Sequence, residues 1–359
     1  MNRKLQLLIL IFTITFKCSA QPLIHISLNI GDPAPPLKVK AWIKGMQIEK
    51  LRNDKIYVLD FWATWCGPCL ALMPHFSKLA KKYQDKVTFL SIDIYERGQV
   101  PISKIRQLVD SMGKRMDFSV GVEEGRFMSK NWADASGYRG IPTIFIVSGG
   151  KIEWTGHPKY ADSVLTKILD KSWSPQFAML KRNNQLYLRQ LEILSAKELI
   201  SKIVRYKVNL TGNTYDRVQI SPDSVLYVID EMVRNIPSLK FLPVFVSYTF
   251  AALLKTDLKK AYNYAQEAMF TSSHVDEPSY GILINQIEEI SANVQLPENF
   301  YRLGVECVQL QIDKNPYPEL GDTPGQYRKM AKLYKLAGDL PKAAEAEEKG
   351  KSFKAPVNF

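Results

Sequence analysis

The pattern of apolar and polar positions divides the chain into two parts near residue 170. Before that point, short runs of β-branched and aromatic residues alternate with segments of helical periodicity. Such runs are typical of buried strands, and their alternation with helices is typical of a parallel sheet covered by helices. The runs expected to form strands are 56–62, 87–94, 118–122 and 144–147. We therefore expect an α/β domain over residues 21–170.

Beyond Trp173 the strand signals end and long helical patterns follow. Apolar residues recur there at the spacing of helices that bury one face. The segments expected to be helical are 186–206, 224–235, 243–254, 258–269, 282–293, 299–312, 325–337 and 341–353. The turns of three expected hairpins, near Leu258, Leu296 and Leu340, lie 38 and 44 residues apart. We therefore expect residues 171–359 to form an all-α, repeat-like domain.

The first twenty residues have the pattern of a signal peptide. A short basic stretch precedes the apolar run 5–16, and small residues follow it up to Ala20. The run is shorter than the roughly 20 residues that a membrane-spanning helix needs. We expect cleavage after Ala20 and export to the periplasm or cell envelope. A lipid anchor on Cys18 is the weaker alternative, because Lys17 stands where that pattern has a small residue.

The composition excludes several classes of protein. With 46% hydrophobic and 23% charged residues the chain is too apolar to be disordered, and four cysteines are too few for a disulfide scaffold. The net charge of +12 is spread over both parts without a basic arm. Because the lysine-rich stretches lie beside acidic residues on helix-like segments, we expect solvated faces and no nucleic-acid partner.

Two of the cysteines, Cys66 and Cys69, form a Cys-x-x-Cys pair just after the run 56–62. In an exported chain such a pair is a structural disulfide, a metal site or a redox centre. The remaining mature cysteine, Cys307, has no histidine pair near it, which disfavours zinc. A disulfide over so short a loop adds little stability but exchanges easily. We therefore interpret the pair as a redox centre, expect no metal or other cofactor, and expect Cys307 to be a buried inert thiol.

The position of the pair predicts which cysteine reacts. The segment 70–83 has apolar residues at helical spacing, so the pair lies at a junction between a strand and a helix. The free N–H groups and the positive dipole at the start of a helix stabilise a thiolate. Cys66 is the expected nucleophile, and Cys69, one turn further, is expected to attack the mixed disulfide and release the product.

Two motifs, in this order, resemble the thioredoxin family. The segment 60–69, which reads DFWATWCGPC and is followed by Pro74, is similar to the active-site strand and helix of thioredoxin. The segment 139–143, which reads RGIPT, is similar to its cis-proline loop. The resemblance implies a thioredoxin-like fold. It also implies that the site consists of Cys66 and Cys69 supported by Asp60, Trp65, Gly67, Pro68, Ile141 and Pro142.

The resemblance implies a substrate groove beside the cysteines. The Ile141–Pro142 peptide would be cis and would pack against the pair. Since proline has no N–H, the backbone of Ile141 would remain free to pair with an incoming substrate strand. Trp65 would border this groove, with core packing as its alternative role, whereas Trp62 is expected to belong to the core.

Asp60 ends an apolar strand, so we expect a buried carboxyl group with a raised pKa. The resemblance implies that it accepts the proton of Cys69. Thioredoxin has a lysine near this acid, and counting along the run 87–94 places Phe89 at that position. Relatives of the TlpA and ResA type have a glutamate three residues after the second cysteine, where this chain has Leu72. The group that accepts and donates this proton is therefore expected to be Asp60 or water.

The spacing of the two motifs resembles that of TlpA-like thiol–disulfide oxidoreductases. Cys66 and Pro142 are 76 residues apart, which is more than a minimal thioredoxin needs, and predicts an inserted helix-strand unit within residues 102–135. TlpA-like proteins have such an insertion together with an N-terminal β-hairpin, which the segment 31–51 suggests here. In the second part, the segment 331–346 resembles a tetratricopeptide repeat.

We therefore expect an exported thiol–disulfide oxidoreductase that reduces or exchanges disulfides in other exported proteins and receives electrons from an upstream donor, expected in the membrane. The glycine and proline between the cysteines and the isoleucine before the cis-proline are those of reducing thioredoxins and favour reduction. One alternative is a helical-repeat binding or adaptor protein, with a docking partner for its C-terminal helices and a secondary dithiol. An equally favoured alternative is that the C-terminal helices bind no partner and only cap the redox domain. A copper-transfer role lacks suitably spaced methionine and histidine ligands.

Overall fold

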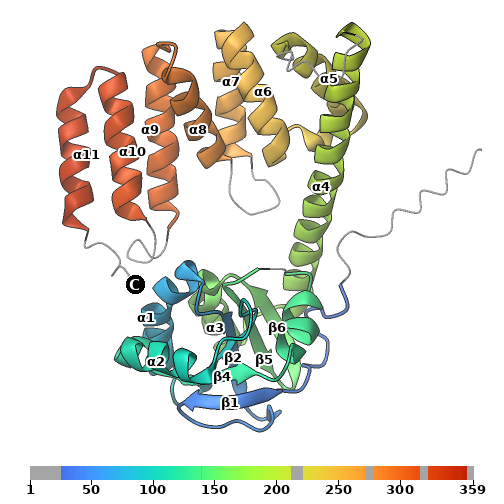
Figure 1. Cartoon of the computed structure of the whole chain (residues 1–359), viewed down its shortest axis with the longest axis vertical. Coiled ribbons are helices and arrows are strands. Elements are labelled where there is room, and N and C mark those ends of the chain that lie inside the picture. Colours follow the sequence, from blue (N-terminus) through green and yellow to red (C-terminus); the bar gives the residue numbers. More distant parts are fainter. Residues whose placement is uncertain (1–25, 139, 212–220, 272–278, 316–321, 354–359) are drawn as a thin grey trace, which may run out of the picture.

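The computed structural model describes residues 26–138, 140–211, 221–271, 279–315 and 322–353, and Figure 1 shows a sheet domain joined by one long helix to a row of helices. The expected order, a helix-covered sheet followed by an all-α region, is confirmed. The expected signal peptide, with Cys18, and Arg139 of the second motif lie outside the described residues.

Six strands form one mixed sheet in the order β1-β4-β3-β2-β5-β6. Strand β2 is parallel to β3, and β3 is parallel to β4, whereas β5, β6 and β1 run antiparallel to their neighbours. The strands are β1 Val39–Lys44, β2 Ile56–Trp62, β3 Val87–Asp93, β4 Ser119–Glu123, β5 Thr143–Ser148 and β6 Lys151–Gly156. The central strand β2 is almost wholly buried, as its β-branched and aromatic run predicts.

Helices cover the two faces of the sheet unequally. Helices α1 Gly67–Lys82, α2 Ile102–Met112 and α3 Ala161–Leu169 contribute to the core on the face that carries Val58 and Trp62. The π-helix η2 Ser129–Asp134 and the segment before β1 contribute to the core on the opposite face. Side chains alternate between faces along a strand, so Asp60 shares the α1 face with Val58 and Trp62.

The inserted unit forms as expected, but the N-terminal β-hairpin does not. Helix α2 continues as the 3₁₀ helix η1 Gly113–Met116, and β4 then joins the sheet between β3 and β1. The segment expected to form a hairpin provides the single strand β1, which pairs with β4. Gly45 ends β1 at φ +73°, where a Cβ atom would lie 2.8 Å from the Cα atom of Ser119. Before β1, Pro33 makes only an isolated bridge to Lys151, because prolines in this stretch have no N–H to donate.

The helices of the second part follow one another along a row (Figure 1). They are α4 Pro175–Thr211, α5 Pro222–Asn235, α6 Pro243–Thr256, α7 Leu258–Phe270, α8 Tyr280–Ser291, α9 Glu298–Asp313, α10 Thr323–Leu336 and α11 Leu340–Ser352, with short 3₁₀ turns η3 Pro158–Tyr160 and η4 Pro237–Leu239 elsewhere. Three begin with an aspartate whose carboxylate accepts a backbone N–H of the first turn, at Asp257, Asp322 and Asp339. That the helices of residues 171–359 form sequence repeats stays a prediction.

Helix α4 belongs to both parts of the molecule. Its first turns place Ala178 and Met179 on the core beneath the sheet, and its later turns place Leu199 and Ile203 on a core shared with α5 and α6. Helices α6 to α11 enclose a further core of their own. Of the helices in the described part of the chain, none combines the length and apolar character that crossing a membrane requires.

Candidate active site

Cys66 and Cys69 lie at the start of α1 and form a disulfide with an S–S distance of 2.02 Å. Cys66 is the N-cap residue, and its Sγ accepts the backbone N–H of Cys69 at 3.3 Å. Both cysteines are buried, at 3% and 1% exposure, whereas Gly67 and Pro68 between them are exposed. The helix start therefore presents its free N–H groups to Cys66, which favours the thiolate form of this sulfur after reduction.

Trp65 stands beside the disulfide with 42% of its surface exposed, so it lies outside the core that holds Trp62. Its Nε1 donates to the backbone oxygen of Tyr95 at 3.0 Å, and the guanidinium carbon of Arg97 lies 4.1 Å from its ring centre. A contact of this kind between a guanidinium and an indole face is attractive and fixes the ring. The ring is thus held at the surface, one residue before Cys66 in the chain.

The second motif forms the loop that leads into β5. The Ile141–Pro142 peptide is cis, as the resemblance implied. Both residues are half-buried, and Ile141 packs against the core cluster that contains Cys66 and Cys69. Thr143 then pairs with Phe61 of β2, which holds the loop beside the strand that ends at the cysteines. The two motifs, far apart in sequence, thus meet at one end of the sheet.

Asp60 is buried, with 4% of its surface exposed, and its Oδ2 accepts a hydrogen bond from Ser91 Oγ at 2.7 Å. Burial raises the pKa of its carboxyl group to about 7, and the hydrogen bond from Ser91 opposes this shift. Within the described residues, burial and the Ser91 hydrogen bond are the two causes of the shift in this pKa. In the sheet, Phe89 pairs with Val58, and Ser91 is the neighbour of Asp60.

A second buried acid, Asp93, was missed by the sequence analysis. It ends β3 beside Trp62, has 1% of its surface exposed, and lies on the same face as Asp60 because the two adjacent strands are in parallel register. Burial, together with the nearby charges of Glu96 and Glu123, raises its pKa to about 9. An acidic residue at the carboxyl end of an apolar strand was the only signal available.

Glu96 is the acid that reaches the active-site loop directly. Its two carboxylate oxygens accept the backbone N–H of Thr64 at 2.6 Å and the hydroxyl of Thr64 at 2.9 Å. These bonds fix the residue that precedes Trp65 and Cys66. The arrangement adds a carboxylate beside the loop but leaves Asp60 as the acid nearest in sequence to the pair.

Other candidates play no direct part in the site. Leu72, which replaces the glutamate of the TlpA and ResA type, is buried at 8% exposure. His75, which follows Pro74 in α1, is buried at 6% exposure. Cys307 lies in the helical core with no exposed surface, and burial raises the pKa of its thiol to about 12. A thiol in this state is inert near neutral pH.

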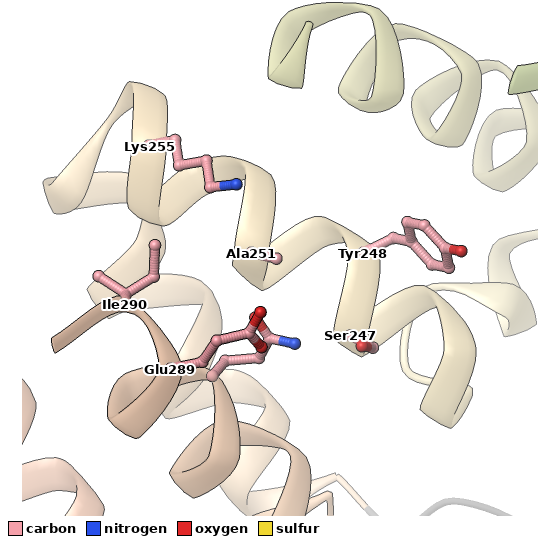
Figure 2. A pocket seen from close by; sticks show the side chains of 7 residues that line it. Ser247, Tyr248, Ala251, Lys255, Glu289 and Ile290 are labelled. Atoms are coloured by element: carbon pink, nitrogen blue, oxygen red, sulfur yellow. The ribbon is translucent and has the colours of Figure 1, made fainter. Parts of the chain in front are cut away.

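A separate depression lies between α6 and α8, in the helical region (Figure 2). Its volume is about 160 Å³, and it is lined by Ser247, Tyr248, Ala251 and Lys255 of α6 and by Gln286, Glu289 and Ile290 of α8. Its side chains offer both charges, a phenol and an amide, which suit a polar ligand or peptide backbone. It contains no thiol and no paired acids, so it has no counterpart to the chemistry at Cys66.

Comparison with known proteins finds relatives among the thioredoxins. The family model for thioredoxin matches residues 44–108. Protein FixW of Rhizobium leguminosarum is 29% identical over 209 residues, which are 55% of this chain and 94% of FixW. A thioredoxin of Chlorobaculum thiosulfatiphilum is 30% identical over 109 residues, 30% of this chain and 71% of that protein. The crystal structure of a thiol-disulfide isomerase from Corynebacterium glutamicum is 23% identical, covers 40% of this chain and 97% of its own, and superposes with a TM-score of 0.33.

Proposed function

The chain belongs to the thioredoxin family of thiol–disulfide oxidoreductases, and we propose that it reduces or exchanges disulfides in other exported proteins of the cell envelope. The observation that carries this proposal is the Cys66–Cys69 disulfide at the start of α1, bordered by Trp65 and by the cis-proline loop. The export itself rests on the apolar run 5–16 and the small residues up to Ala20.

The reaction starts from the reduced pair. The Cys66 thiolate attacks one sulfur of a client disulfide, a Cys66–client disulfide forms, and the second client sulfur leaves as a thiolate. Cys69 then loses its proton and attacks Cys66 Sγ, so the Cys66–Cys69 disulfide forms and the first client sulfur leaves. Two electrons have passed to the client, and a dithiol donor of the envelope must return them to the pair.

Asp60 is the group we propose as acceptor of the Cys69 proton. Its carboxyl faces the side of the sheet that α1 covers, and its pKa of about 7 places proton uptake and release near neutral pH. Asp93 has a pKa of about 9 and stays protonated through this range, so it is a poorer acceptor. The burial of Asp60 and its pKa near 7 thus support the role of proton acceptor that the resemblance implied for it.

Trapping of clients tests the proposal. In a Cys69→Ser variant of the full chain the second step is blocked, so Cys66 should remain joined to native clients as mixed disulfides that a reductant dissolves. Cys66→Ser is the negative control, and Cys307→Ser is the matched control at a buried thiol. Recovery of no mixed disulfide from envelope fractions with Cys69→Ser, or equal recovery with Cys66→Ser, would count against the proposal.

The proposed export has its own test. Mass spectrometry of the mature protein should find a chain that starts at Gln21, after cleavage of the signal peptide.

A second proposal, that the helical region docks a partner, rests on the depression between α6 and α8. Its lining includes the exposed and oppositely charged side chains of Lys255 and Glu289 (Figure 2). A Lys255→Glu variant should lose partners captured by the full chain while its thiol–disulfide exchange with small disulfides stays unchanged. Retention of every partner would contradict this second proposal.

A further inference from the structure

Arg182, in the first turns of α4, is a buried charge with no place in the reaction described above. Only 3% of its surface is exposed. Its Nη1 donates to Asn29 Oδ1 and its Nη2 to the carbonyl oxygen of Ser136, and its guanidinium carbon lies 5.5 Å from the centre of the Tyr138 ring. Asn29 also donates from Nδ2 to Asn183 Oδ1 at 3.0 Å. One arginine of the helical region therefore ties together two separate segments of the sheet domain.

The chemistry of Arg182 suits directed contacts better than simple packing. Burial lowers the pKa of its guanidinium, and Tyr138 and Asp32 act in the opposite direction. An apolar side chain would fill this position without the desolvation cost of a charge. What arginine adds is a planar group that presents two N–H donors at once to two different acceptors.

The segment that Arg182 holds leads into the cis-proline loop. Ser136 is itself buried, and its hydroxyl donates to the carbonyl oxygen of Ala133 at 2.8 Å. Tyr138 precedes Gly140 by two residues and Ile141 by three. On the other side of the loop, Thr143 is fixed by pairing with Phe61. The described residues on either side of Ile141 are thus held by the sheet, at Thr143, and by α4, at Ser136 and Tyr138.

We propose that Arg182 is a positioning residue for client binding, because α4 holds Ser136 and Tyr138 and thereby the Ile141 backbone that a client strand pairs with. This inference rests on the proposed function, in which the client pairs with the cis-proline loop. The helical region then contributes to the client affinity of the thiol–disulfide centre even though Arg182 itself does not touch the client.

The test compares two oxidised substrates on the full mature chain. Insulin is a protein disulfide that must dock along the loop, whereas cystamine is a small disulfide that needs only Cys66. Arg182→Gln should raise KM for insulin about tenfold with little change in kcat, because a loop released from Arg182 must be ordered again when the client binds. The rate with cystamine and the reduction potential should stay at the wild-type values. Arg182→Lys should restore only part of the loss, since an ammonium cannot reproduce the planar pair of donors.

Two further variants keep the test decisive. Arg189→Gln removes an exposed charge from the same helix and should change nothing. Tyr138→Leu, at a half-buried ring, should raise KM for insulin less than Arg182→Gln does, and it decides the matter if Arg182→Gln fails to fold. The inference is overturned if folded Arg182→Gln and Tyr138→Leu keep the wild-type KM for insulin. It is also overturned if Arg182→Gln loses activity with insulin and with cystamine to the same extent. Failure of the wild-type protein to react with cystamine would instead overturn the proposed function.

Discussion

Replacing Asp60 with asparagine should stabilise the sheet domain in a pH-dependent way. The pKa of the Asp60 carboxyl rises from its ordinary 3.8 to about 7 in the folded protein because the group is buried. Below about pH 4 the carboxyl is protonated in both the folded and the unfolded chain, so its titration does not change the free energy of unfolding. Between about pH 4 and 7 only the unfolded chain releases this proton, so stability falls by about 1.4 kcal/mol per pH unit.

The wild-type protein loses free energy of unfolding equal to this slope times a pKa shift of roughly three units. This loss is about 4 kcal/mol at any pH above 7. Asparagine has nearly the same shape, and its side-chain oxygen still accepts the hydrogen bond from Ser91. The free energy of unfolding of Asp60→Asn should therefore exceed that of the wild type by a few kcal/mol at pH 8, and the difference should vanish near pH 4.

The assay follows from the distribution of tryptophan. All six tryptophans lie at or before residue 173, so intrinsic fluorescence during urea unfolding reports on the sheet domain. Measurements on the oxidised protein from pH 4 to 8 keep the disulfide constant. Ionisation of Asp93 affects both proteins alike and cancels in the difference. A difference that does not depend on pH would show that Asp60 titrates normally and would remove it as a proton acceptor near neutrality.

Further outcomes can be checked by the same methods. Asp93→Asn should stabilise the sheet domain by an amount that grows from about pH 4 up to about pH 9, because over that range the unfolded chain releases the proton that the folded carboxyl, with its raised pKa, keeps; unfolding curves should therefore differ from the wild type more at pH 9.5 than at pH 6. Gly45→Ala should cost about 1–3 kcal/mol in urea unfolding, since the residue has a positive φ and its Cβ atom would clash with Ser119; an unchanged midpoint would contradict the close approach. After mild reduction at neutral pH, brief alkylation should label Cys66 and leave Cys307 unmodified, and mass spectrometry of peptides would expose any labelling of Cys307.

The chemistry of the site could be predicted because it lies in short local patterns. A strand followed directly by two cysteines and a helix places Cys66 at a helix start wherever the rest of the chain goes. Asp60 could be expected to be buried because it lies within an apolar run. The partners that tune these groups could not be predicted, because Ser91 and Asp93 become their neighbours only through the pairing of β2 with β3.

The start of α4 shows a second limit of sequence patterns. The periodicity predicted a helix from residue 186, whereas the structure begins it at Pro175. In these first turns the exposed side chains include Phe177 and Leu180, at 70% and 65% exposure, while the charged Arg182 is buried. Although Ala178 is buried in the same turns, these three residues break the usual relation between hydrophobicity and burial, so apolar periodicity alone does not reveal which face touches the sheet domain.

Helix α4 also sets a length scale for the whole protein. Between Arg182, fixed on the sheet domain, and Leu191, which packs on the core with α5, there are 191 − 182 = 9 residues of uninterrupted helix. At 1.5 Å per residue this stretch spans about 14 Å, and a helix resists bending far more than a loop of equal length. A client held by the helical row would therefore meet Cys66 only if its disulfide reached across that gap, so the spacer would select clients by their size rather than by their sequence.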